Sequence, residues 1–244
     1  MSQPVSPISK SAPVSTRRIL FRRLLAGCVV VVAVAWICTR FNLNWSRSPG
    51  EVVDQFNGVS VYFNGPTGHV DGRTVTADGY NLGLRWQCVE FVKRYYFERY
   101  GHRMPDSRGN AKDFFDSRLE DGELNAARGL IQYGNGGSGV PKVGDIVVFA
   151  PWMLNLYGHV AIVSRVETAS IEIVQQNPGP FASSREQLVL RFDANGHVSV
   201  GSGRMLGGDV LGWLSRPGAV SNFVFKAYDA PKEDGCFANR KLGR

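Results

Sequence analysis

Two residues in this chain of 244 have the types and surroundings that nucleophilic catalysis needs, and the first is Cys88. It lies in LRWQCVEF and begins the run CVEFVKRYYFERYG, whose apolar spacing predicts a helix from Cys88 that stops at Gly101. A thiol in the first turn of a helix lies beside unpaired backbone N–H groups, which stabilise the thiolate and can bind a developing oxyanion. We therefore predict that Cys88 is a nucleophile with a lowered pKa. The alternative is a small apolar residue packed in a core.

The second residue is His159, because a cysteine nucleophile needs a base. His159 begins the apolar run HVAIVSRV directly after Gly158, where a polar side chain needs a reason to be. His69 and His102 lie in loops and His197 follows a hairpin turn, so we expect these three at the solvated surface. The pattern makes His159 the candidate general base. The alternative interpretation is that His159 is a structural histidine at the edge of the core, hydrogen-bonded to a backbone carbonyl.

A base of this kind is usually oriented by a third group, and the next predicted strand offers two amides. This strand is SIEIVQQN, which ends at Asn177. Because side chains alternate along a strand, Gln175 and Asn177 share one face and Gln176 points away from it.

The register between the two strands decides which amide faces His159. If Val166 pairs with Ser170 across the turn, His159 lies opposite Asn177, and a register tighter by two residues puts it opposite Gln175. Either amide can accept a hydrogen bond from the imidazole. The residues thus predict a cysteine–histidine–amide arrangement and leave the third member open.

The elements that must position these residues follow a simple order along the chain. Residues 56–83 are predicted to be loop with one short strand. A helix from Cys88 and a second helix over 111–118 follow. Short β-branched or apolar runs come afterwards, at 145–150, 159–166, 170–177, 187–192 and 210–214. Helices followed by strands, with a hairpin turn at 193–196, predict an α+β fold with the helices packed on an antiparallel sheet.

The chain divides by composition into five parts. These are a basic, disordered segment (1–23), an apolar segment (24–39), a linker (40–53), a folded domain (54–220) and a tail without a clear pattern (221–244).

The positive charge of the chain belongs to its N-terminal part. Of 28 Lys and Arg residues, 7 precede the first acid, Glu51, so 21 basic residues remain beside 21 acids in the rest of the chain. The folded domain is therefore neutral overall, and we expect no nucleic-acid binding.

Residues 24–39 predict a single transmembrane or signal segment, since they carry no charge and come after the basic run RRILFRR. A basic flank on the N-terminal side predicts an N-terminus inside and an exported domain. A cleaved signal peptide is the alternative, because Ala33-Val34-Ala35 supplies a cleavage site. Leu25-Ala26-Gly27-Cys28 resembles a lipoprotein box but precedes the apolar stretch, which argues against lipidation.

The remaining motifs predict no cofactor and no metal. The chain has no H-E-x-x-H or C-x-x-C, and the G-x-G-x-x-G match at 134–139 opens no helix after a strand. Two cysteines, Cys28 and Cys38, fall in the apolar segment. For an exported chain, a disulfide between Cys88 and Cys236 is the alternative to a catalytic Cys88.

Taken together, these runs resemble a CHAP domain, a cysteine- and histidine-dependent amidohydrolase/peptidase fold related to papain. The resemblance spans residues 54–216 and rests on LRWQCVEF, GDIVVFAP, YGHVAIVSRV, IEIVQQNPGP and LGWL in this order. It is most similar to the amidase domain of glutathionylspermidine synthetase/amidase, where W-Q-C-V-E-F, G-H-V-A-I, E-Q-N and L-G-W occur in the same succession.

The resemblance implies roles for the site residues. Cys88 would be the nucleophile, His159 the general base and then acid, and backbone N–H groups around Gln87 and Cys88 the oxyanion hole. The family's third residue is commonly the Glu of an E-x-N segment, and that position is Gln175 here. Gln175 can orient His159 without a full charge, or Asn177 takes the role, as an asparagine does in papain-like enzymes.

We therefore expect a membrane-anchored, exported cysteine amidohydrolase that cleaves a peptide-type amide, with peptidoglycan peptides as substrate. A glutathionyl-polyamine amide is the second substrate class, suggested by the resemblance. A weakly active or inactive CHAP-like binding module is the third possibility. The sequence leaves the oligomeric state open.

Overall fold

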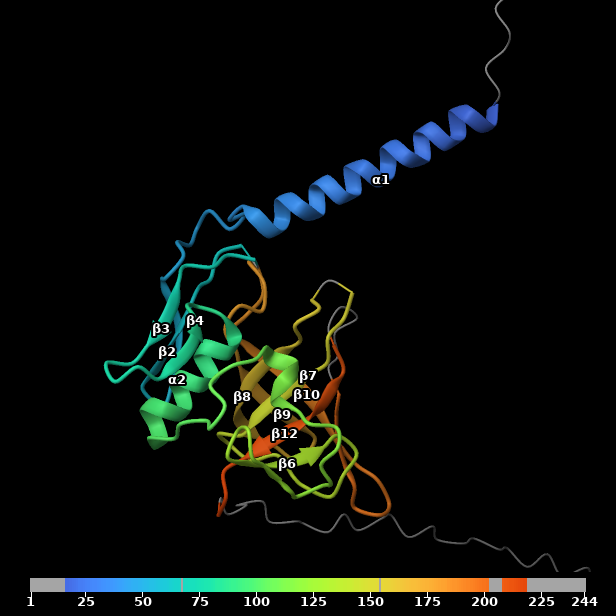
Figure 1. Cartoon of the computed structure of the whole chain (residues 1–244). Helices are drawn as coiled ribbons and strands as arrows, with labels where there is room; N and C mark the ends of the chain where they lie inside the picture. The colour runs from blue at the N-terminus through green and yellow to red at the C-terminus, as the bar shows by residue number, and fades with distance from the viewer. Residues whose placement is uncertain (1–15, 67, 154, 202–207, 219–244) are drawn as a thin grey trace, which may run out of the picture.

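The computed structural model describes residues 16–66, 68–153, 155–201 and 208–218 (Figure 1). The predictions for residues 1–15 and 219–244, Cys236 included, lie outside the described residues. Within these ranges the strands are β1 (Val52–Phe56), β2 (Val59–Tyr62), β3 (Arg73–Val75), β4 (Asn81–Leu84), β5 (Leu124–Asn125), β6 (Leu130–Gly134), β7 (Ile146–Phe149), β8 (His159–Val166), β9 (Ser170–Val174), β10 (Arg185–Phe192), β11 (Val198–Gly201) and β12 (Val210–Ser215).

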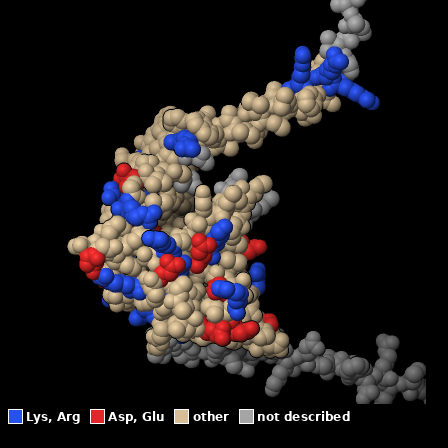
Figure 2. All heavy atoms as spheres, in the orientation of Figure 1, with Lys and Arg blue, Asp and Glu red and all other residues tan. Residues whose placement is uncertain are grey.

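The first helix, α1 (Thr16–Arg40), contains the predicted apolar segment and projects away from the domain (Figure 1). Its stretch Arg17–Ile37 is long and apolar enough to cross a membrane, a test of length and composition that a signal sequence near an N-terminus also passes. None of that stretch is buried. Figure 2 shows basic side chains at both ends of α1 and none along its middle.

The domain is built on an eight-stranded sheet with the order β11-β10-β9-β8-β7-β12-β6-β5, in which every neighbouring pair is antiparallel. The sheet curls until β11 meets the residues that come after β6. There the N–H of Gly136 donates to the carbonyl of Val198 at 2.8 Å, and the N–H of Val198 donates to Gly137 at 2.7 Å. The curl protects a sheet edge that would otherwise be open.

Each face of the curled sheet carries its own core. The inner core is Val147, Phe149, Ala161, Val163, Ile171, Ile173, Leu188, Leu190, Val198, Val200, Val210 and Trp213. The outer core joins the other face to the second α-helix, α2 (Cys88–Tyr100), which contributes Phe91, Val92, Tyr95 and Tyr96. Complete burial of a large apolar side chain contributes roughly 1.5–3 kcal/mol, so these four residues fix α2 firmly on the sheet.

The predicted helix from Cys88 is confirmed. It ends at Tyr100, and Gly101 takes the left-handed conformation that caps it, with φ 62°. The run 159–166 is also confirmed as a strand, β8, with the predicted bounds.

The predicted fold class holds in part. The sheet is antiparallel as predicted, but it dominates the domain, and α2 is the sole α-helix packed on it among the described residues. The prediction of an α-helix over 111–118 is wrong. The chain forms only a short 3-10 helix here, η1 (Ala111–Phe114), and the next residue, Phe115, has an extended backbone.

The region from 56 to 83 holds more strand than predicted, namely β2, β3 and β4. The Asn57–Gly58 turn between β1 and β2 has φ values of 50° and 87°, which is the backbone of a tight hairpin turn. Asn-Gly is a strong sequence signal for such a hairpin, so this pair of strands was predictable.

Candidate active site

Cys88 lies where β4 turns sharply into α2. The N–H of Gln87 donates to the carbonyl of Leu84 at 3.1 Å and closes the turn, and Trp86 within it has a φ of 62°. A left-handed backbone at a bulky residue costs about 1–2 kcal/mol and is concentrated at functional sites. The strained turn places the thiol in the first turn of the helix.

Two glycines allow the backbone approaches on which the site depends. A Cβ on Gly83 would lie 3.1 Å from the Cα of Glu90 in α2, and Gly83 has a φ of 131°. A Cβ on Gly158 would lie 2.7 Å from the carbonyl oxygen of Phe149. The first approach seats the start of α2 against β4, and the second brings His159 in at the beginning of β8.

The thiol of Cys88 packs against the outer core, and burial raises its pKa. Three backbone N–H groups, those of Val160, Val89 and Cys88 itself, lie beside the sulfur and oppose this rise without cancelling it. The prediction that the helix start alone lowers the pKa is therefore wrong for the resting thiol. Val160 comes directly after His159, so β8 brings the backbone beside the histidine to the sulfur.

The imidazole of His159 contacts Gln175, because Nε2 lies 2.9 Å from the side-chain Oε1 of Gln175. Since Oε1 can only accept, Nε2 carries the proton and Nδ1 is the basic nitrogen. Gln175 is one of the two residues predicted as the third group.

The register between β8 and β9 differs from the predicted one near the turn and agrees with it toward the site. Val166 pairs with Ile171 and not with Ser170, and an irregularity between Val163 and Arg165 restores the predicted register toward the site. That register would place His159 opposite Asn177, but β9 ends at Val174, and the residue that contacts His159 is Gln175, beyond the end of the strand. The register tighter by two residues, which would have set Gln175 opposite His159, does not form. An extra residue in one strand cannot be inferred from the run of either strand alone.

Asn177 departs from the predicted alternation, since its φ of 56° takes it out of strand geometry. Its Nδ2 donates to the Oε1 of Gln87 at 2.7 Å, and the Nε2 of Gln87 donates to the carbonyl of His69 at 2.7 Å. The backbone N–H of Gln87 is engaged by Leu84. Asn177 thus orients the residue next to the candidate nucleophile, Cys88.

Gln176, whose role was not predicted, is buried and joins the strand end to the start of α2. Its Nε2 donates to the carbonyl of Gln87 at 3.0 Å and to Glu90 at 2.9 Å, and its Oε1 accepts from the N–H of Tyr62 at 2.8 Å. Glu90 in turn forms a buried ion pair with Arg94 at 2.7 Å. Alternation predicts that Gln176 points away from Gln175, but nothing in the sequence indicates these partners.

His69, predicted at the solvated surface, stands at the edge of the site. Its ring stacks on that of Trp86, with centroids 6.0 Å apart and planes 12° apart, and its carbonyl binds Gln87. His69 lies in a Gly-rich loop, where no periodicity connects it to the nucleophile.

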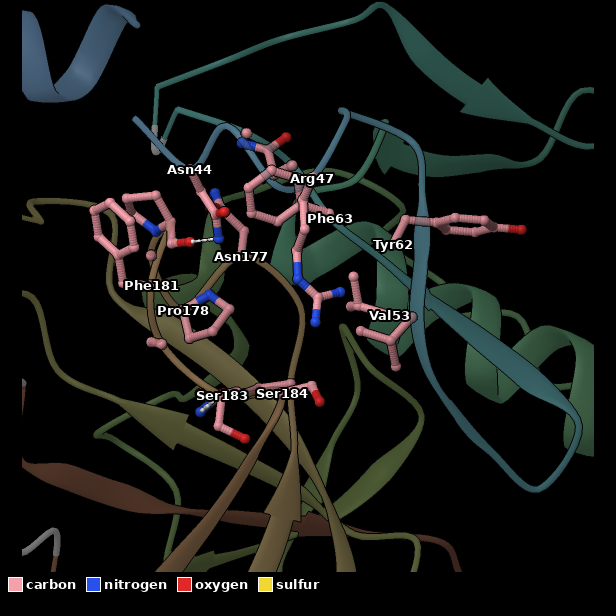
Figure 3. A pocket seen from close by; sticks show the side chains of 17 residues that line it. Asn44, Arg47, Val53, Tyr62, Phe63, Asn177, Pro178, Phe181, Ser183 and Ser184 are labelled. Carbon is pink, nitrogen blue, oxygen red and sulfur yellow. Dashed lines mark hydrogen bonds between the residues drawn. The ribbon is translucent and has the colours of Figure 1, made fainter. Parts of the chain in front are cut away.

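A cavity of about 520 Å³ adjoins the site on the side of Gln175 and Asn177, and neither Cys88 nor His159 lines it. Figure 3 shows Asn44 at its upper end and Ser183 and Ser184 at its lower end. The Nδ2 of Asn44 donates to the carbonyl of Pro180 at 2.8 Å, so the linker after α1 is tied to the loop that leads from β9 to β10. Among the described residues, no group of three or more His, Cys, Asp or Glu residues could hold a metal ion.

Comparison with known families confirms the resemblance to the CHAP domain. Residues 77–177 match the model of that family, a range that contains Gln87, Cys88, His159, Gln175 and Asn177.

The curated relatives come from Crithidia fasciculata. Glutathionylspermidine synthase is 32% identical over 156 residues, which cover 58% of this chain and 20% of that protein. Trypanothione synthetase is 26% identical over 129 residues, which cover 52% of this chain and 20% of that protein. The chain thus spans about a fifth of the length of the curated relatives it matches.

Two solved structures are also similar. The wild type endolysin LysIME-EF1 is 22% identical, with 61% of this chain and 59% of that chain covered and a TM-score of 0.33. Ly7917 is 17% identical, with 55% and 54% covered and a TM-score of 0.32.

Proposed function

We propose that this chain, whose residues 77–177 match the CHAP domain, is a cysteine-dependent hydrolase of a peptide-type amide bond. The observation that carries the proposal is the convergence of α2 and β8. Cys88 lies in the first turn of α2 beside the N–H of Val160, and the neighbouring His159 is held by Gln175. Nucleophile, base and orienting group thus come from three elements that the fold holds together.

The proposed reaction begins with transfer of the thiol proton from Cys88 to Nδ1 of His159. The thiolate attacks the carbonyl carbon of the amide, and the imidazolium protonates the leaving amine as the C–N bond breaks. The acyl group remains on Cys88 as a thioester. Water, deprotonated by His159, then attacks the thioester, releases a carboxylic acid and restores the thiol.

The oxyanion of each tetrahedral intermediate needs hydrogen-bond donors near the sulfur. The N–H of Cys88 lies beside the thiol, and we assign it this role. One Nε2–H of Gln87 is engaged by His69, and the other is the second donor in the proposal. The bond from Asn177 to Gln87 holds that amide in place.

The raised pKa of the thiol indicates how the thiolate forms. Because burial disfavours an isolated thiolate, ionisation depends on the imidazolium that His159 becomes when it takes the proton. Thiolate and imidazolium therefore form and disappear together, as a coupled pair.

The proposed substrate is a peptide of the cell wall. An apolar helix with a basic flank on its N-terminal side favours export of the domain after it, by the distribution of positive charge, and outside the membrane peptidoglycan presents peptide amides. Whether α1 is retained as an anchor or removed as a signal, the domain is exported in this proposal.

A glutathionyl-polyamine amide is the second candidate substrate. The observation that favours it is the 32% identity to glutathionylspermidine synthase over 156 residues. Such a substrate requires the same cysteine chemistry on a smaller amide.

The test of function uses the full-length chain in detergent, incubated with purified peptidoglycan and, separately, with glutathionylspermidine. We expect new free amines from peptidoglycan, detected by amine labelling and mass spectrometry, and none with Cys88→Ala. Release from glutathionylspermidine alone would replace the first substrate with the second. No release from either substrate would contradict the hydrolase proposal and favour a CHAP-like binding module.

A further inference from the structure

Three polar side chains occupy the same face of three neighbouring strands. His159 begins β8, and Gln175 lies just past the end of β9, two residues after Ile173. In β10, Glu186 pairs with Ile173. Because directly paired residues share a face and side chains alternate, Glu186 projects on the same face as Gln175.

The hydrogen bonds agree with this placement. The Nε2 of Gln175 donates to the carboxylate Oε2 of Glu186 at 3.1 Å and to the carbonyl of Ser183 at 3.4 Å, while its Oε1 lies 2.9 Å from the Nε2 of His159. An ionised carboxylate can only accept hydrogen bonds. Glu186 therefore fixes which end of the Gln175 amide faces the imidazole.

The basic residue next to Glu186 is directed elsewhere. Arg185 precedes it in β10 and binds Asp54 at 2.6 Å and Glu172 at 3.2 Å. Alternation along the strand separates these two side chains, so the Arg185 ion pairs lie on the opposite face.

We propose that Glu186 is a positioning residue that supplies, through the amide of Gln175, the negative charge that acts on His159. The amide passes the polarisation from carboxylate to imidazole, because hydrogen bonds in a chain polarise one another, and Gln175 at the centre of this chain is buried between the half-buried Glu186 and His159. Glu186 thereby holds the proton of the neutral imidazole on Nε2 and stabilises the imidazolium. This inference rests on the proposed cysteine–histidine chemistry.

The first test is Glu186→Gln, which keeps the size of the side chain and removes its charge. A hydrogen bond to a charged group changes an equilibrium constant by about 10- to 100-fold. We therefore expect the rate of Cys88 alkylation by iodoacetamide at about pH 6 to fall about tenfold. Where turnover is measurable, the alkaline limb of the kcat/KM profile should move to lower pH, because an imidazolium without the carboxylate loses its proton more easily.

The second test is the double variant Gln175→Glu/Glu186→Gln, which exchanges the amide and the carboxylate between the two positions. The carboxylate then contacts His159 directly, and the amide at 186 can donate to it, so the chain of hydrogen bonds is kept with its charge moved next to the imidazole. We expect the double variant to recover at least the wild-type alkylation rate at about pH 6. Gln175→Glu alone places two carboxylates together, and these share a proton.

Glu167→Gln is the matched control, since it removes an exposed carboxylate that pairs with Arg165 at the turn after β8. It should leave the alkylation profile unchanged. A Glu186→Gln variant with the wild-type profile, or a double variant no faster than Glu186→Gln, would overturn the role of Glu186. A wild-type chain whose Cys88 does not react below neutral pH would instead overturn the proposed function itself.

Discussion

Gln175 and Gln176 are neighbours of the same residue type, both buried, and they lie on opposite sides of the strand end. Gln176 faces α2 and binds the carbonyl of Gln87 and the carboxylate of Glu90. Gln175 faces the other way and joins His159 to Glu186. One glutamine thus fixes the start of the helix, and the other contacts the imidazole of the proposed base.

The difference lies in what the partners can do. On the helix side, the partners of Gln176 are backbone groups and a paired carboxylate, whose loss leaves buried polar groups unsatisfied. On the histidine side, the imidazole gains and loses a proton during the proposed reaction. We therefore expect substitutions on the helix side to lower stability, and substitutions on the histidine side to lower activity while the fold remains.

The largest effect is expected on the histidine side, from His159→Gln. Removing one member of a nucleophile–base unit costs about a thousandfold or more in rate, because the remaining member cannot act alone. The unfolding midpoint in urea should stay close to that of the wild type, since His159 is half-buried. Comparable losses of activity and of stability would contradict the division between the two sides.

On the helix side, Glu90→Gln tests the buried pair with Arg94. Loss of one charge leaves the other buried without compensation, so we expect a loss of about 3 kcal/mol in the free energy of unfolding, measured with urea. The exposed pair of Glu167 and Arg165 is the control, and Glu167→Gln should cost about 1 kcal/mol or less. Equal effects of the two variants would show that the buried pair has no special role.

A pH effect on folding that is separate from the site is expected at Asp145. Burial raises the pKa of this carboxyl to about 7, although Ser215 and the N–H of Lys142 donate to it. The folded chain keeps a proton that the unfolded chain releases above about pH 4, so stability falls as the pH rises from about 4 to 7.

Asp145→Asn should remove this dependence. At about pH 8 we expect the variant to exceed the wild type by roughly 2–4 kcal/mol in urea unfolding, and the difference should vanish near pH 4. A variant less stable than the wild type at pH 8 would contradict the assignment. The pH profile of Cys88 alkylation should be the same in both proteins, which separates folding from chemistry.

The smallest effect is expected from Asn177→Gly. Glycine adopts the φ of 56° without strain, so the relief of backbone strain offsets the lost hydrogen bond to Gln87, and stability should change by less than about 1 kcal/mol. Turnover should fall a few-fold, because Gln87 is less firmly held beside the nucleophile. Loss of activity as large as that of His159→Gln would instead make Asn177 a member of the catalytic unit.

The sequence predicts the regular elements that carry the site better than the contacts between them. HVAIVSRV is rich in β-branched residues, and the helix from Cys88 has a clear spacing and a glycine stop, so both are predicted with their bounds. The Asn57–Gly58 hairpin can also be predicted, because Asn-Gly favours a tight hairpin turn, although the Gly-rich composition around it indicates loop.

Other features depend on several elements at once. The irregularity between Val163 and Arg165 sets the register near the turn apart from the register toward the site, and the contact between Gln175 and Glu186 requires the pairing of β9 with β10 across a long connection. The raised pKa of Cys88 reflects burial against the sheet, whereas the first turn of a helix, considered alone, favours the opposite direction. These contacts and shifts arise from tertiary packing, which a local pattern does not contain.

The most direct test of the central claim is the pH dependence of Cys88 alkylation in the full-length wild type and in His159→Gln. If imidazolium and thiolate form together, the wild type should react with iodoacetamide at about pH 6, and the variant should react only as the pH approaches or exceeds about 8.5, where a free thiol ionises. Identical profiles for the two proteins would contradict the account, because the thiol would then ionise without His159.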